Sequence, residues 1–122
     1  MNKFIFDVDG TLTPSRGIID LKFKAFFNTF CLTNNVYLVT GSDKVKTVEQ
    51  ISEPTYNLCK RVYQCNGNDV WEKDVNIHTT NWTLPEFAEY FLNGCLYESR
   101  FNLRTGTHIE KRPGMVNFSV VG

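Results

Sequence analysis

The stretch FIFDVDGTLT, residues 4–13, decides the fold of this chain. Its apolar run predicts a strand over residues 3–8 that is parallel to its neighbours and covered on both faces. The run ends in two aspartates one residue apart, Asp7 and Asp9, followed by a glycine and hydroxyl residues. Ligands of open α/β sheets bind beyond the carboxyl ends of the strands. The two carboxylates therefore mark a candidate site.

Strands and helices alternate from this motif to about residue 77, as in a doubly wound α/β sheet. Asp20 is expected to cap a helix with one aromatic stripe, formed by Phe23, Phe26, Phe27 and Phe30. A strand at 36–39 leads into a helix with Ser42 as N-cap and one apolar side, formed by Val45, Val48 and Ile51. Further strands are expected at 61–65 and near 70–71. We assign residues 1–77 to one domain.

Residues 78–122 have a different pattern and form a second domain with antiparallel strands. Thr83 to Glu86 match a capping box, and Phe87, Tyr90 and Phe91 form the apolar face of a helix that Asn93-Gly94 is expected to stop. Alternating apolar residues near 101–103 and 116–120 predict strands, with turns at 105–106 and 113–114.

The composition excludes several classes of function. Thirteen basic residues balance thirteen acidic ones, so nothing favours binding to nucleic acid or to an anionic membrane surface. No apolar run approaches a membrane span and no signal peptide is recognisable, which predicts a cytoplasmic protein. The four cysteines lack zinc-ligand spacing and are expected to be reduced and mostly buried.

The chemistry of the aspartate pair predicts phosphoryl transfer. Two close carboxylates are costly unless a cation or a shared proton relieves them, so Asp7 and Asp9 predict a Mg²⁺ site. The amides of Gly10 and Thr11 can donate to an anion, and Ser42 at a helix N-terminus would add further donors. Aspartates in a generic DxD would be turn or capping residues. The preceding strand and the trailing Gly-Thr-Leu-Thr favour a site with an aspartate nucleophile.

FDVDGTLT also resembles the first motif of the haloacid dehalogenase (HAD) superfamily of phosphotransferases. Four further stretches are similar to motifs of the eukaryotic-type phosphomannomutases: PSR at 14–16, VTGSDKV at 39–45 with Glu49-Gln50 after it, CNG at 65–67 and RTGTHIEKRPGMVNFS at 104–119. The resemblance runs from residue 3 to the last residue and is strongest at both ends. It implies a HAD-like Rossmannoid core, incomplete here, followed by the start of an α+β cap.

The resemblance also implies a role for each matching residue. Asp7 would be the nucleophile and a Mg²⁺ ligand, and Asp9 would be the general acid and base, with its carbonyl on the metal. The hydroxyl of Thr40 or Ser42 would hold the transferring phosphoryl group. Backbone groups of three residues would bind phosphate: Gly10, Thr11 and Gly41. Side chains of three others would bind the distal phosphate and the sugar: Arg16, Arg112 and Asn117.

The activity implied is the interconversion of mannose 6-phosphate and mannose 1-phosphate, with a hexose 1,6-bisphosphate as activator. The family also uses a lysine and further aspartates that follow the cap, and these 122 residues do not contain them. We therefore expect an N-terminal portion of a longer protein, with weak Mg²⁺ binding and an exposed sheet face and edge. Two alternatives stay open: a sugar phosphatase of the same superfamily, and a non-catalytic remnant that binds sugar phosphate or protein. A homodimer through the cap is expected from the resemblance.

Overall fold

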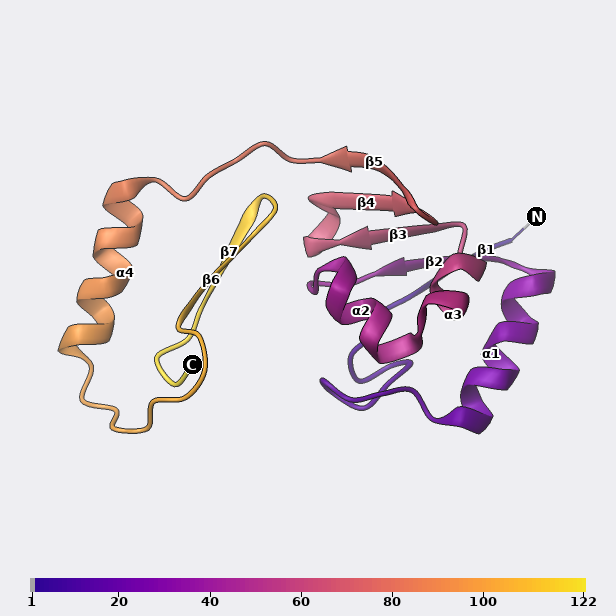
Figure 1. Ribbon diagram of the computed structural model, residues 1–122, viewed down its shortest axis with the longest axis horizontal. Helices are drawn as coiled ribbons and strands as arrows, with labels where there is room; N and C mark the ends of the chain where they lie inside the picture. Colours follow the sequence, from indigo (N-terminus) through magenta and orange to yellow (C-terminus); the bar gives the residue numbers. More distant parts are fainter. Residues whose placement is uncertain (1) are drawn as a thin grey trace. The chain divides into compact units, whose positions relative to one another are not determined.

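The computed structural model describes residues 2–122, which form two compact units. The N-terminal unit ends at Thr79, and the second unit runs from Thr80 to Gly122. Figure 1 shows a sheet with three helices in the first unit, and one helix with a β-hairpin in the second. The expected mixed α/β class is confirmed.

The sheet of the N-terminal unit has 5 strands in the order β1-β2-β3-β4-β5. Its parallel strands are β1 (Lys3–Phe6), β2 (Asn35–Val39) and β3 (Arg61–Gln64). The antiparallel strands are β4 (Asp69–Glu72) and β5 (Val75–Thr79), with the short 3-10 turn η1 (Cys65–Gly67) between β3 and β4. The helices are α1 (Leu21–Thr33), α2 (Lys44–Ile51) and α3 (Glu53–Leu58). Strand β5 was not predicted from the sequence.

The core lies between the sheet and its helices. Because β1, β2 and β3 follow one another across the sheet, right-handed crossovers place their connecting helices on one face. Val36, Leu38 and Val62 point to that face and are fully buried. Phe6 packs edge-on against Phe27 of α1, with ring centroids 5.6 Å apart.

The other face of the sheet is largely uncovered within the described residues. Side chains along β1 alternate between exposed and half-buried, Ile5 is 67% exposed and Val39 of β2 is 40% exposed. Strand β1 also lies at the edge of the sheet. The prediction of a strand covered on both faces is therefore wrong for this chain, because α1, α2 and α3 share one side. The exposed apolar face and the edge strand agree with the expectation for an incomplete core.

Helix α1 forms where the sequence predicted it. The Asp20 carboxylate accepts a hydrogen bond from the Phe23 amide at 2.9 Å, which confirms the N-cap. The buried face is narrower than predicted, because Phe27 and Cys31 are buried whereas Phe26 is 66% exposed.

Helix α2 differs from the prediction in its cap and in its buried face. Its N-cap is Asp43, whose carboxylate accepts from the Lys46 amide at 2.9 Å. Ser42, the predicted N-cap, instead directs its hydroxyl towards Asp9. The buried side chains are Thr47, Gln50 and Ile51. Val45, predicted to face inward, is 69% exposed because polar contacts of Thr47 and Gln50 fix the rotation of the helix.

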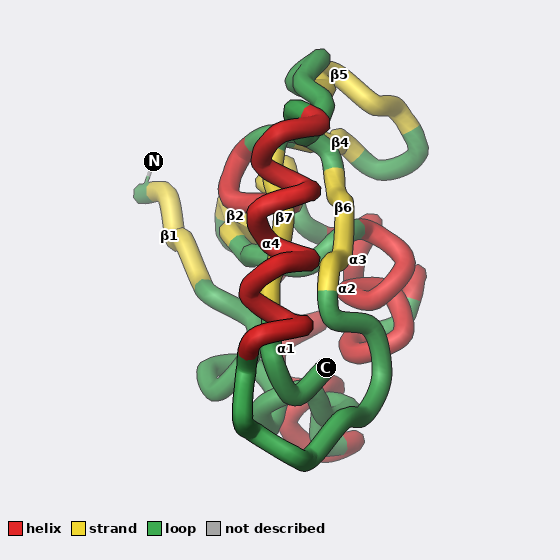
Figure 2. Tube along the Cα trace, turned by 90° about the vertical axis from the view of Figure 1, so that its left-hand side faces the viewer, coloured by secondary structure: helices red, strands yellow, loops and turns green. Residues whose placement is uncertain are grey.

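The second unit contains α4 (Glu86–Glu98) and a hairpin of β6 (Ile109–Arg112) and β7 (Met115–Phe118), joined by the predicted turn at 113–114. Figure 2 shows the red helix α4 beside the hairpin, and Lys111 of β6 forms a 2.8 Å ion pair with Glu89 of α4. Every side chain of residues 80–122 is exposed or half-buried.

Three local predictions in this unit are wrong. The capping box does not form, because the N-cap of α4 is Pro85 and no side chain caps it. The helix runs through Asn93 and Gly94 to Glu98, because Gly94 lacks the positive φ of a C-terminal cap. The strand expected near 101–103 is a loop, and the Arg104 guanidinium holds it by donating to carbonyl oxygens of Leu96 at 3.2 Å and Val120 at 3.1 Å.

No helix within residues 2–122 combines the length and the apolar character needed to cross a bilayer.

Candidate active site

The two aspartates lie beyond the carboxyl end of β1 in different surroundings. Strand β1 ends at Phe6, and Asp7 is exposed, with no side-chain hydrogen bond to any residue of 2–122. Asp9 is half-buried within the turn that follows. The side chain of Asp7 is thus open to an incoming group, whereas the chain itself holds Asp9.

A tight turn over residues 8–13 fixes the backbone between these carboxylates. The carbonyl of Val8 accepts from the amides of Thr11 at 3.2 Å, Leu12 at 2.9 Å and Thr13 at 3.1 Å. Gly10 has a φ of 74°, which favours glycine, and its amide donates to the Thr13 carbonyl at 2.8 Å. The amides of Gly10 and Thr11 therefore bond within the turn, and a phosphate would have to share or replace those bonds. Their predicted phosphate contact stays a prediction.

Three segments converge on the carboxylate of Asp9. Its Oδ1 accepts from the Arg16 amide at 2.7 Å and from the Gln50 side-chain amide at 2.7 Å. Its Oδ2 accepts from the Ser42 hydroxyl at 3.5 Å. The sequence predicted that the segments of Asp9 and Ser42 would face each other, and the structure brings them together.

These contacts also set the acidity of Asp9. Burial disfavours its ionised form and raises the pKa, but the Arg16 amide and the Gln50 amide outweigh it, helped by the charge of Lys46. The pKa of the Asp9 carboxyl therefore lies below its ordinary value. Asp9 is an ionised group at neutral pH and can accept a proton.

Thr40 and Ser42 lie at the end of β2, on the side of the site opposite the aspartate turn. Both side chains are buried, and the Ser42 amide donates to the Thr40 hydroxyl oxygen at 3.1 Å. Of the two hydroxyls, that of Ser42 is directed at Asp9. Gly41 lies between them, and a Cβ there would come within 3.4 Å of Asn66 Oδ1. Which hydroxyl holds phosphate stays open, as does the predicted role of Gly41.

Gln64 of β3 fixes the position of Ser42 through hydrogen bonds. In the amide orientation that gives each polar atom a partner, Gln64 donates to the Ser42 carbonyl at 2.8 Å and accepts from the Tyr56 hydroxyl at 3.1 Å. Gln64 is fully buried, so the position of Ser42 depends on the core.

The predictions from sequence did not assign Gln50 to the site. Its amide links Asp9 to the buried face of α2, and its backbone carbonyl accepts from the Ile19 amide at 2.9 Å. The available signal was the pair Glu49-Gln50, which belongs to the stretch that resembles the phosphomannomutases but was given no role. We therefore add Gln50 as a residue that positions Asp9.

The predicted sugar and phosphate ligands fall into two groups. Arg16 is exposed and has a φ of 57°, and it reaches Asp9 through its amide. In the second unit, Arg112 is ion-paired with Glu110 at 2.9 Å, and its side chain is 9% exposed. Asn117 is the register partner of Glu110, so it shares a face of the hairpin with Arg112. The roles of all three residues stay predictions.

The described residues do not by themselves form a Mg²⁺ site. No group of three or more His, Cys, Asp or Glu side chains converges anywhere in residues 2–122. Asp7 offers one open carboxylate, while Oδ1 of Asp9 accepts two short hydrogen bonds. Because Mg²⁺ requires an octahedral set of oxygen ligands, further groups would have to complete the site.

Solved structures define the class of this fold. A haloacid dehalogenase-like hydrolase from Bacteroides thetaiotaomicron matches with a TM-score of 0.57 and 21% identity, over 78% of this chain and 36% of that chain. A HAD subclass IIB sugar phosphatase matches with a TM-score of 0.56 and 17% identity, over 80% and 38%. The chain therefore has the HAD-like fold over most of its length.

Curated proteins similar in sequence to this chain are phosphomannomutases. The chain is 34% identical over 126 residues to a phosphomannomutase of Galdieria sulphuraria, covering 97% of this chain and 49% of the relative. It is 33% identical over 126 residues to phosphomannomutase 1 of Mus musculus, covering 97% and 48%. The chain is homologous to the phosphomannomutases, and it spans about half the length of the curated relatives it matches. No protein-family model matches it.

Proposed function

We propose that this chain forms the nucleophile-bearing part of a phosphomannomutase, which interconverts mannose 6-phosphate and mannose 1-phosphate. The observation that carries the proposal is the pair of unlike aspartates: Asp7 is exposed, and Asp9 is held by Ser42 and Gln50. The homology to phosphomannomutases supports the choice of substrate. A cytoplasmic location and a homodimer through the cap belong to the same proposal.

In this mechanism Asp7 attacks the phosphorus of a hexose bisphosphate. The bond from phosphorus to the sugar oxygen breaks, and the phosphoryl group moves to the Asp7 carboxylate. A hydroxyl of a hexose monophosphate then attacks the aspartyl phosphate and restores Asp7. The accessibility of Asp7 suits it to this role, since no hydrogen bond within the chain has to be broken first.

Asp9 moves the proton in each transfer. Asp9 is ionised at neutral pH, so its carboxylate can accept the proton of the attacking sugar hydroxyl. In the reverse transfer the same proton returns to the leaving sugar oxygen. The bonds from Arg16 and Gln50 orient one carboxylate oxygen, and the other lies beside Ser42.

Mg²⁺, when bound, would neutralise charge on the transferring phosphoryl group. Asp7 would contribute one ligand, and the complete protein would supply those missing from residues 2–122. Arg16, Arg112 and Asn117 would hold the distal phosphate and the sugar, since guanidinium groups bind phosphate through paired hydrogen bonds.

The test is an isomerisation assay of the full-length protein with a hexose 1,6-bisphosphate present, followed by phosphorus NMR. Asp7→Asn is expected to lose nearly all activity, and Asp9→Asn about 10²-fold to 10⁴-fold. Asp20→Asn is the matched control, because asparagine also caps a helix and Asp20 belongs to α1. Retention of parental activity by Asp7→Asn would overturn the proposal.

The same assay separates the two alternatives. Free phosphate released in excess of isomerised sugar identifies a sugar phosphatase, the activity named for one structural neighbour. A protein that binds hexose phosphate in calorimetry without turnover is a non-catalytic binding remnant.

A further inference from the structure

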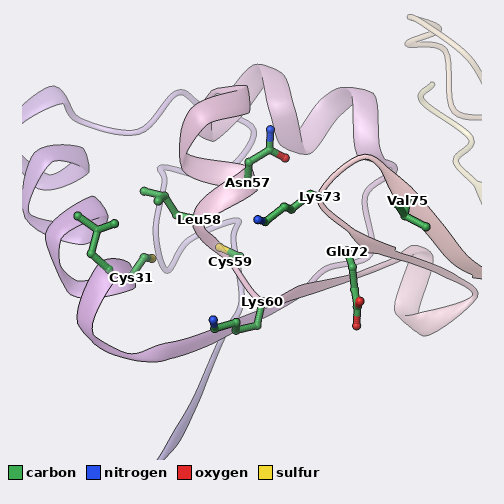
Figure 3. A pocket seen from close by; sticks show the side chains of 9 residues that line it. Cys31, Asn57, Leu58, Cys59, Lys60, Glu72, Lys73 and Val75 are labelled. Atoms are coloured by element: carbon green, nitrogen blue, oxygen red, sulfur yellow. The ribbon is translucent and has the colours of Figure 1, made fainter.

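A cavity of about 450 Å³ opens on the N-terminal unit, away from the aspartate site. Its walls come from the end of α1, the end of α3 and the β4–β5 turn (Figure 3). Lys60 lines the cavity and directly precedes β3, so the cavity lies at the amino ends of the parallel strands, whereas Asp7 and Thr40 follow the carboxyl ends. Its volume is within the range of small-molecule sites. The proposed phosphotransferase chemistry leaves this cavity without a function.

Two lysine side chains bring positive charge to the cavity. Lys60 has its backbone fixed, because its amide donates to the Val36 carbonyl at 2.7 Å. Lys73 lies in the β4–β5 turn, and its side chain extends towards the end of α3 (Figure 3). The Lys73 carbonyl accepts from the Lys44 ammonium group at 3.3 Å, which ties this turn to α2. Both lysines are therefore carried by backbone segments whose positions are fixed.

These two charges have no counter-charge within the described part of the chain. Neither Lys60 nor Lys73 forms an ion pair with a carboxylate of residues 2–122. Glu72, which also lines the cavity, is paired with Arg61, whose Nε donates to it at 2.9 Å, and Asp74 of the same turn does not line the cavity. A ligand can therefore balance two positive charges here.

An amide oxygen beside the cavity lacks a donor. Asn57 lies in the last turn of α3 and lines the cavity, and its Oδ1 is buried without a hydrogen-bond partner among residues 2–122. A buried carbonyl oxygen without a donor is costly, so a ligand hydroxyl or N–H group at this position is favoured. Leu32, Leu58 and Val75 give the cavity apolar surface as well. A matching ligand has a negative charge, a donor and an apolar part.

We propose that this cavity binds a small phosphate monoester whose organic part carries a hydroxyl or N–H donor. The phosphate, with a charge of about −2 at neutral pH, balances Lys60 and Lys73, since lysine binds phosphate as a point charge. A carboxylate carries a single charge and leaves one lysine without a counter-charge. The donor of the ligand reaches Asn57 Oδ1, and the rest of the molecule covers the apolar side chains. This site is separate from the aspartate turn and does not depend on the proposed function.

The experiment titrates the 122-residue chain with uridine 5′-monophosphate and follows the backbone amide signals by ¹H–¹⁵N NMR. The expected result is a saturable shift of the signals of residues 57–60 and 72–75, while those of Asp7 and Asp9 stay in place. Uridine lacks the phosphate, and inorganic phosphate lacks the donor and the apolar part. Each of them is expected to bind at least about tenfold more weakly than the nucleotide, because each loses one set of contacts.

Substitutions identify the groups that hold the ligand. Lys60→Gln and Lys73→Gln should each weaken nucleotide binding by about tenfold, since each removes a charged hydrogen-bond donor. Both side chains are exposed, so these variants are expected to fold like the parent. Lys22→Gln is the matched control, because it removes the same charge from the first turn of α1, outside the cavity. Asn57→Leu should weaken binding of the nucleotide but not of inorganic phosphate.

Three results would overturn the proposal. The first is a titration in which residues 57–60 and 72–75 do not shift, whether or not the signals of the aspartate site do. The second is unchanged nucleotide binding in a variant that combines Lys60→Gln with Lys73→Gln. The third is equally tight binding of inorganic phosphate and the nucleotide, which would mean an anion site alone. None of them bears on the isomerisation assay, whose outcome depends on Asp7.

Discussion

The two units of this chain hold their secondary structure in different ways. In the N-terminal unit, Leu38 and Val62 belong to a continuous buried core that joins the sheet to three helices. In residues 80–122, by contrast, α4 leaves its apolar side chains in solvent, with Phe87 78% and Phe91 67% exposed. A helix and a hairpin can thus form from local pattern and turn chemistry, while cooperative stability requires burial.

Core truncation should show the largest difference between the units. Leu38→Ala removes a fully buried side chain and should lower the free energy of unfolding of the N-terminal unit by about 2–5 kcal/mol. Phe91→Ala, which removes a larger but mostly exposed side chain, should cost less than about 1 kcal/mol. Urea unfolding followed by the fluorescence of Trp71 and Trp82, one in each unit, measures both changes. Equal losses would mean that the second unit is packed more tightly in solution than in this structure.

Alkaline pH should destabilise the N-terminal unit through Tyr56. Burial raises its pKa to about 12, whereas the unfolded chain has a tyrosine pKa of about 10. The contribution of Tyr56 to the free energy of unfolding is complete below pH ~10. It is lost as the pH rises towards 12, and the total loss is about 3 kcal/mol. Urea midpoints at intervals from pH 8 to pH 12 measure this slope. Tyr56→Phe removes the ionisable group, so an unchanged slope in that variant would exclude Tyr56 as the cause.

Helix capping should give the smallest difference. Asp20→Ala removes an observed N-cap and should cost about 1 kcal/mol. Thr83→Ala removes the residue of the capping box that does not form, and should change the stability by less than about 0.5 kcal/mol. Thermal unfolding by circular dichroism compares the two variants. A cost for Thr83→Ala that matches Asp20→Ala would show that the capping box forms in solution.

Features carried by a few neighbouring residues were predictable from the sequence. The strand before Asp7, the cap at Asp20 and the turn at residues 113–114 depend on hydrogen bonds and periodicity within a short segment. The α/β class followed because strands and helices alternate. Apolar spacing gave the wrong buried face for α2, since Val45 is exposed and Gln50 is buried, the reverse of what hydrophobicity alone predicts.

The sequence by itself determined the two aspartates at a strand end, the HAD-like class and the homology to phosphomannomutases, because short contiguous motifs carry most of that information. Only the tertiary structure decided that Gln50 and Ser42 hold Asp9. The physical reason is separation along the chain. Gln50 follows Asp9 by 41 positions, and a contact over such a distance depends on how the strands pair and how each helix rotates against the sheet.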